Sequence, residues 1–151
     1  MKTISICIIA FLLFNCNQSR NQNQQKTPAE LRYELQSKEE AYPLNYVSLS
    51  DVTMTAQQKK VRNSTIFRKA KYKPDGVLIE GFVVNKASIA TFKDVKVQIS
   101  YYSKTKSIIY QKTFVLYEFY KPGSRLYFSL KDYPVEGYTS FHAEVVSAVA
   151  N

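Results

Sequence analysis

The chain is poor in the residues from which most catalytic and metal sites are built. Among 151 residues it has one histidine, His142, two cysteines, Cys7 and Cys16, and no tryptophan. A single histidine removes most triad and zinc schemes, and both cysteines precede the expected folded region, where they cannot close a disulfide. The four glycines form no phosphate-binding loop. We therefore predict no enzyme activity, no metal and no cofactor.

The sequence also lacks an apolar run of the ~20 residues that a membrane-spanning helix needs. The longest run covers residues 4–14 and follows Lys2, as in the apolar part of a signal peptide. No small-residue cleavage site of the general type follows it. Another signal must therefore mark the end of this segment.

The segment Leu13-Phe14-Asn15-Cys16 resembles the lipobox of bacterial lipoproteins. This resemblance implies that residues 1–15 are a signal peptide and that Cys16 carries acyl chains such as palmitate. The protein would then be membrane-anchored in the bacterial cell envelope, on the periplasmic or extracellular side. Residues 16–27 would form the lipidated cysteine and an Asn/Gln-rich tether. An uncleaved apolar anchor, or a secreted protein with an incidental Cys16, remains an alternative.

Residues 28–42 carry the signature of an amphipathic helix. Thr27 is a favourable N-cap, a proline follows it, and Glu30 completes a capping box. Leu31 and Leu35 share one face. We expect this narrow apolar face to pack on the domain, or the helix to act as a spacer between the tether and the core.

Residues 46–151 change to the twofold hydrophobic period that is typical of strands. In the clearest segment, DVKVQISYY, the apolar positions are Val95, Val97, Ile99 and Tyr101. Turn signals interrupt the pattern, among them KPDG at Lys73–Gly76. About seven short strands in roughly 105 residues predict an all-β fold, an immunoglobulin-like antiparallel β-sandwich preceded by a short N-terminal helix.

The series IEGFVVNKA, FKDVKVQISYYSKT, YKPGSRLYFSL and FHAEVVSA is similar to immunoglobulin-like modules of the FxLYD type. The matching positions are Gly81, Val83, Asn85, Val95, Val97, Pro122, Gly123 and Phe128. The resemblance covers about residues 77–148 and implies an envelope-associated sandwich of a kind that mostly has no assigned activity. It supports the fold and points to no chemistry.

The most suggestive cluster is KKVRNSTIFRKAKYK, residues 59–73, which contains seven basic residues and no acid. If Thr65 to Lys73 is a strand, one of its faces forms a basic stripe that ends in an aromatic: Phe67, Lys69, Lys71 and Lys73. The candidate contacts for an anionic ligand or for lipid headgroups are Lys60, Arg62, Lys69, Lys71 and Lys73. The alternative is a charged edge strand that discourages edge-to-edge pairing.

The twelve tyrosines are too many for one small core, so several should be exposed. The candidate aromatic contacts are Tyr102, Tyr117 and Tyr127. Packing between tyrosines on neighbouring strands is the alternative. The acids offer little, since Glu39 and Glu40 are expected to be solvated at a helix end, and Asp132 lies at a strand end.

These features together predict a lipid-anchored protein of the cell envelope that acts as a non-catalytic interaction or structural module. The alternative is an envelope protein that binds an anionic polysaccharide or glycan through the basic stripe and exposed tyrosines. The expected partners are the membrane, through the N-terminal lipid, and an envelope protein or glycan. Nucleic acid is not expected outside the cytoplasm.

Overall fold

The computed structural model describes residues 26–151, so the predicted signal segment, Cys16 and most of the predicted tether lie outside the described residues. Two helices precede six strands in this part of the chain. Their bounds are α1 Pro28–Ala41, η1 (a 3-10 turn) Pro43–Asn45, β1 Val47–Arg62, β2 Lys71–Asn85, β3 Phe92–Tyr102, β4 Ile108–Leu116, β5 Arg125–Asp132 and β6 Ser140–Ala150.

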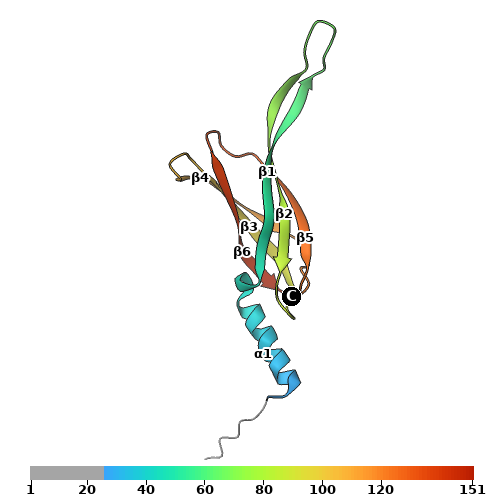
Figure 1. The fold of residues 1–151 in the computed structure, drawn as a ribbon, viewed down its shortest axis with the longest axis vertical. Helices are drawn as coiled ribbons and strands as arrows, with labels where there is room; N and C mark the ends of the chain where they lie inside the picture. The colour runs from blue at the N-terminus through green and yellow to red at the C-terminus, as the bar shows by residue number, and fades with distance from the viewer. Residues whose placement is uncertain (1–25) are drawn as a thin grey trace, which may run out of the picture.

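The six strands form two antiparallel sheets of three strands each. Their orders are β1-β2-β5 and β4-β3-β6. Figure 1 shows the two sheets facing each other, with α1 at one end of the molecule and a hairpin of β1 and β2 projecting from the other. The fold is therefore an all-β sandwich with a short N-terminal helix, as the sequence predicts, although the described residues hold six strands and not about seven.

The core between the sheets follows the alternation that is visible in the sequence. On β3, the four predicted core residues are fully buried: Val95, Val97, Ile99 and Tyr101. Facing them from β2, Ile79 and Val83 are buried as completely. Gly81 lies between these two, where an added Cβ would come within 3.2 Å of the Phe128 ring. Strand periodicity thus predicted the interior of both sheets.

A buried polar contact joins the two sheets. Asp132, at the end of β5, has no exposed surface. Its carboxylate accepts a 2.8 Å hydrogen bond from the Tyr101 hydroxyl on β3 and a 2.9 Å bond from the Lys112 ammonium on β4. Burial, together with the hydrogen bond to Asp132, raises the pKa of Tyr101. The sequence predicted that Asp132 lies at a strand end but not that it is buried. Its two hydrogen bonds join one sheet to the other without a disulfide.

Helix α1 forms as predicted but packs differently. The Thr27 side chain accepts from the Glu30 backbone, and the Glu30 side chain accepts from the Thr27 N–H, which completes the capping box. The apolar face is not docked, because Leu31 is 53% and Leu35 39% exposed. Figure 1 shows α1 extending away from the sandwich. The expected packing of the apolar face on the domain is therefore wrong, and a spacer between the tether and the core stays a prediction.

Glu39 attaches α1 to the sandwich, and its predicted solvation is wrong. The side chain is 1% exposed, and its carboxylate accepts backbone hydrogen bonds from Ser88 at 2.7 Å, Ile89 at 2.9 Å and Ala90 at 2.8 Å. Burial alone would raise the pKa of Glu39, but the three amide donors outweigh it and lower the pKa below 4.5. A carboxylate near a helix C-terminus opposes the helix dipole, so these amides also offset an unfavourable position.

The predicted turn at Lys73–Gly76 is a bulge inside β2. The pairs Ala56–Val77 and Gln58–Pro74 leave two residues of β2 opposite one of β1. Gly76 has φ +80, and a Cβ there would lie 2.3 Å from the Asp132 carbonyl oxygen. A bulge of this kind uses a left-handed glycine and increases the local twist. The strand expected at Thr65–Lys73 therefore does not exist separately, since its last residues continue into β2.

Candidate functional site

Residues 57–74 form a two-stranded arm that leaves the sandwich. Strand β5 pairs with β2 only from Val77 to Val84, so the preceding part of β2 has β1 as its only partner within the described residues. At about 3.3 Å per residue, the seven steps along the chain from Gln58 to Thr65 extend roughly 23 Å. Figure 1 shows this hairpin projecting beyond both sheets.

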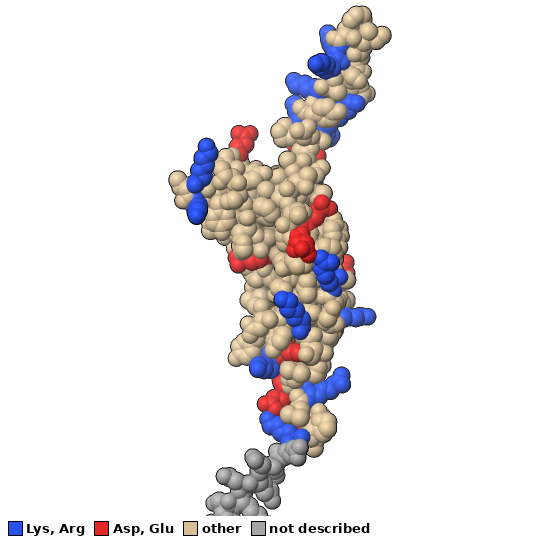
Figure 2. All heavy atoms as spheres, in the orientation of Figure 1, with Lys and Arg blue, Asp and Glu red and all other residues tan. Residues whose placement is uncertain are grey.

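The arm carries only positive charge. No acid occurs between Asp51 and Asp75, and the Asp75 carboxylate is itself held 2.6 Å from the Lys131 ammonium. All seven basic side chains are exposed: Lys59, Lys60, Arg62, Arg68, Lys69, Lys71 and Lys73. Figure 2 shows the basic residues gathered along the arm, with acidic residues confined to the rest of the molecule. The arm is therefore a region of concentrated positive potential.

The register of the arm places like charges opposite one another. Lys59 faces Lys73, and Arg62 faces Lys71. Directly opposed like charges destabilise an antiparallel pair, and an isolated two-stranded hairpin is only marginally stable in water. The Arg62 guanidinium offsets part of this by donating to the Lys69 carbonyl oxygen at 3.2 Å. A negatively charged partner would relieve the repulsion.

The end of the arm is apolar. Thr65 and Arg68 exchange backbone hydrogen bonds of 2.8 and 3.2 Å, which closes a two-residue turn at Ile66 and Phe67. These two residues, the tip pair, are 95% and 93% exposed. Two-residue hairpin turns favour Asn-Gly or Asp-Gly, whereas here both positions hold large hydrophobic side chains. Turn formation therefore does not account for their identity.

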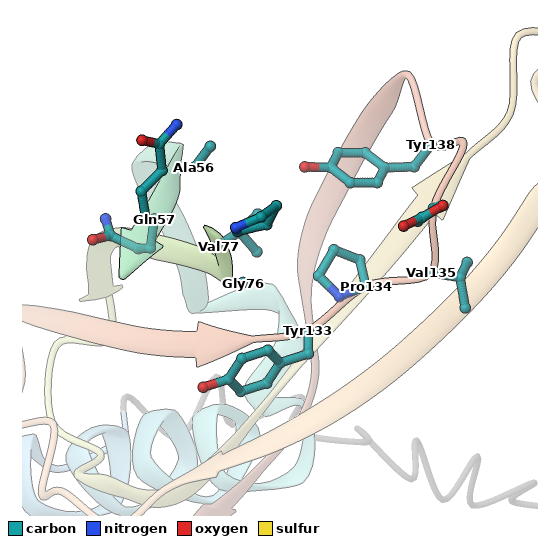
Figure 3. A pocket seen from close by; sticks show the side chains of 11 residues that line it. Ala56, Gln57, Gly76, Val77, Tyr133, Pro134, Val135 and Tyr138 are labelled. Carbon is teal, nitrogen blue, oxygen red and sulfur yellow. The ribbon is translucent and has the colours of Figure 1, made fainter. Parts of the chain in front are cut away.

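A pocket of about 420 Å³ lies where the arm joins the sandwich. Gln57, Gln58 and Val77 line one side, and the connection between β5 and β6 supplies the other, including Tyr133 and Tyr138. Figure 3 shows these two rings reaching toward the β1–β2 side across the pocket. Aromatic rings beside amide side chains suit a ring-shaped polar ligand such as a sugar. No local sequence pattern predicted this pocket.

The basic candidates cluster, but not in the predicted way. Lys60 and Arg62 lie on β1, Lys71 and Lys73 lie on β2, and Lys69 lies in the loop between them. Phe67 is in the turn and not on a strand face. The single-strand stripe is thus wrong, and its residues surround a hairpin. The sequence analysis missed Ile66 as a candidate contact. The signal that could have identified it is the apolar pair Ile66-Phe67, which stands among polar residues in a turn without glycine.

The aromatic candidates are not brought together. Tyr102 and Tyr117 lie at opposite ends of the β3–β4 ladder, as the pairs Tyr102–Ile108 and Val95–Leu116 show. Tyr127 lies on the outside of the other sheet, where its ring meets Phe82 edge-on at 5.8 Å and its hydroxyl bonds to Glu80. For Tyr127, the structure matches the packing alternative.

The remaining chemical candidates are isolated. His142 is exposed, as predicted, with its Nε2 atom 3.9 Å from the Glu144 carboxylate. Residues 26–151 contain no cluster of three or more groups that could hold a metal. No helix in that range is long and apolar enough to cross a membrane. Cys16 lies outside the described residues.

The chain was also compared with models of protein families, with curated proteins and with solved structures, and none of them matches it. The interpretation of the arm and the pocket therefore rests on their own geometry and charge.

Proposed function

We propose that this protein is a lipid-anchored, non-catalytic module of the bacterial cell envelope, and that its arm is the surface that contacts a partner. The observation that carries the proposal is the arm itself, in which seven exposed basic side chains are unaccompanied by any acid. Like charges opposed across a marginal hairpin favour an anionic partner over a neutral one.

We also propose the immunoglobulin-like class for the sandwich. The order of the strands supports it, because the chain builds part of the first sheet with β1 and β2, crosses to the second with β3 and β4, and returns with β5 before finishing in β6. Buried positions from the FxLYD resemblance, Val83, Val95 and Val97, are consistent with this class.

Helix α1, which follows the proposed anchor in the chain, and the arm lie at opposite ends of the described residues. Helix α1 begins at Pro28, at the end of the molecule away from the arm (Figure 1). The eleven residues from Asn17 to Thr27 span at most about 40 Å when fully extended. A lipid on Cys16 would thus hold the start of α1 within about 40 Å of its membrane.

A second candidate is an envelope protein that binds an acidic glycan. The pocket at the root of the arm favours it, since Tyr133, Tyr138 and Gln57 could hold one sugar ring while the basic side chains contact the rest of the polymer. Acidic polysaccharide and the arm would then interact over several sugar units.

Two measurements test these proposals in cells and on a column. Cys16→Ala should release the protein from the membrane fraction and abolish acyl labelling, whereas an unchanged distribution contradicts the lipid anchor. Charge reversal of Lys69, Lys71 and Lys73 to Glu should abolish retention on an acidic polysaccharide matrix. Retention unaltered by this reversal contradicts a role for the arm in binding glycan.

A further inference from the structure

We infer that the arm docks on an anionic lipid bilayer and that the tip pair, Ile66 and Phe67, enters the boundary between headgroups and acyl chains. This inference rests on the proposed role of the arm as the contact surface and names its partner.

The first support is the position of the tip pair. Both side chains are more than nine-tenths exposed at the outermost turn of a projecting hairpin, so neither contributes to the core. Large apolar side chains gain most of their transfer free energy on leaving water, and a bilayer receives them without a preformed pocket. The turn is closed by the hydrogen bonds between Thr65 and Arg68, which satisfies backbone groups next to the inserted side chains.

The second support is the basic collar behind the tip pair. Arg68 and Lys69 follow it directly, and Arg62 lies on the other strand close to the same end. Long basic side chains can keep their charge at the headgroups while their aliphatic stems follow the inserted residues. An apolar end above a cationic collar matches the order of layers in an anionic membrane, with acyl chains beneath phosphates.

The same observations disfavour the other occupants. A second copy of the arm would bring seven further positive charges against the first seven. A glycan would use rings on which sugars stack, whereas Ile66 is a branched aliphatic side chain, and the aromatic pocket lies at the root of the arm and not at its tip. Among a second copy, a glycan and a lipid surface, only the lipid surface uses both the charge and the tip pair.

The test uses residues 26–151, which contain all the strands and core residues described above and lack Cys16, so that binding cannot come from the anchor. Sedimentation with vesicles of phosphatidylcholine alone is compared with vesicles containing 30% phosphatidylglycerol, a composition chosen on the order of natural anionic content. We expect binding to the anionic vesicles only, weakening as salt rises, because charges near a surface are screened over about 10 Å at 0.1 M.

The double variant Ile66→Asn/Phe67→Gly should weaken binding to anionic vesicles by about tenfold or more, since it removes two large apolar groups from the bound state. Its retention on an acidic polysaccharide matrix should be unchanged. The matched control is Ile108→Asn/Phe119→Gly, which removes one isoleucine and one phenylalanine that are exposed outside the arm and should leave vesicle binding unchanged.

Insertion is measured directly with a polarity-sensitive dye on Phe67→Cys, in a segment that otherwise contains no cysteine. The emission should shift to the blue on anionic vesicles and be quenched by lipids with a spin label in the acyl chain, whereas the dye on Phe119→Cys, also at an exposed position, should do neither.

The inference would be overturned if Ile66→Asn/Phe67→Gly bound anionic vesicles as tightly as the native protein. It would also be overturned if the emission of the dye at position 67 did not change on these vesicles. Retention on polysaccharide without vesicle binding would also overturn it and would favour the glycan. If reversing Lys69, Lys71 and Lys73 to Glu changes neither vesicle binding nor polysaccharide retention, the proposed role of the arm fails as well.

Discussion

Replacing Glu39 by Gln tests whether one carboxylate holds α1 to the sandwich. In the native protein both oxygens are used, Oε1 by the Ser88 amide and Oε2 by the amides of Ile89 and Ala90. Glutamine has the same shape but presents an NH₂ group to at least one of these donors. Hydrogen bonds to a charged acceptor contribute about 1.5–3 kcal/mol each, and Ser88, one of the three donor residues, is exposed to water, which reduces the loss. We expect a loss of about 2 kcal/mol in the free energy of unfolding.

Two measurements report the change. For a domain of this size, ~2 kcal/mol corresponds to a fall in Tm of roughly 6–10 °C. Hydrogen exchange should show a tenfold or larger loss of protection at Ser88, Ile89 and Ala90, because opening of α1 exposes their amides. The matched control is Glu40→Gln, which removes the same charge from a residue bonded only to the Gln36 side chain. Its effect on Tm should be within about 2 °C.

The pH dependence gives a sharper criterion. Because the pKa of Glu39 is lower in the folded protein than its ordinary 4.5, the folded state gains stability from this group above pH 4.5. That contribution is lost as the pH falls through the lowered folded pKa. The difference between the native protein and Glu39→Gln should therefore be full at pH 7 and shrink in acid. A difference that is independent of pH, or one matched by Glu40→Gln, would refute the reasoning.

Three further predictions concern the link between the sheets and the arm. Asp132→Asn should lower the free energy of unfolding, measured in urea, by about 2–3 kcal/mol, which is less than the loss from breaking a fully buried ion pair because Lys112 is partly exposed. Asp75→Asn, in the exposed pair with Lys131, should lower it by less than ~1 kcal/mol. Equal losses would contradict the buried link between the sheets. Gly76→Ala should destabilise the fold by more than about 2 kcal/mol, because the added Cβ would meet the Asp132 carbonyl oxygen. Gly123→Ala should destabilise it by only about 1 kcal/mol, because the space around this residue is open. The reverse order of the two losses in thermal melts would contradict the bulge. Exchanging the tip pair for Asn-Gly should change the free energy of unfolding, measured by calorimetry, by no more than ~0.5 kcal/mol, because both side chains are exposed. A larger loss would mean that the tip pair stabilises the fold.

Some of the fold could be predicted because its signals are local. The capping box at Thr27 and Glu30 needs only neighbouring residues, and the period-2 pattern of β3 identified the side of the strand that is buried. The prediction of a turn at KPDG was wrong because it, too, used only local signals. Proline, aspartate and glycine have identical local preferences in a turn and in a bulge, and the choice depends on whether another strand is available to pair with the residues on both sides. Here β1 supplies that strand.

The basic candidates were found as a group, since charge is visible in any sequence, but their arrangement was not. Reading residues 65–73 as one strand placed Phe67 on a face, whereas pairing with β1 places it in the turn. The pocket and the role of Glu39 had no local signal, because Glu39 meets amides 49 to 51 residues away.

The sequence by itself determined a capped helix, strands with one buried side and a cluster of positive charge, whereas the export signal and the lipid attachment at Cys16 stay predictions. Composition and short-range periodicity are sufficient for that, since they depend on residues within a few positions of one another. The tertiary structure decided where those segments meet. The residues predicted to form a basic strand lie in a projecting arm, and Glu39, predicted to be solvated, attaches α1 to the sandwich. Both outcomes depend on pairing and burial between residues that are distant in the chain.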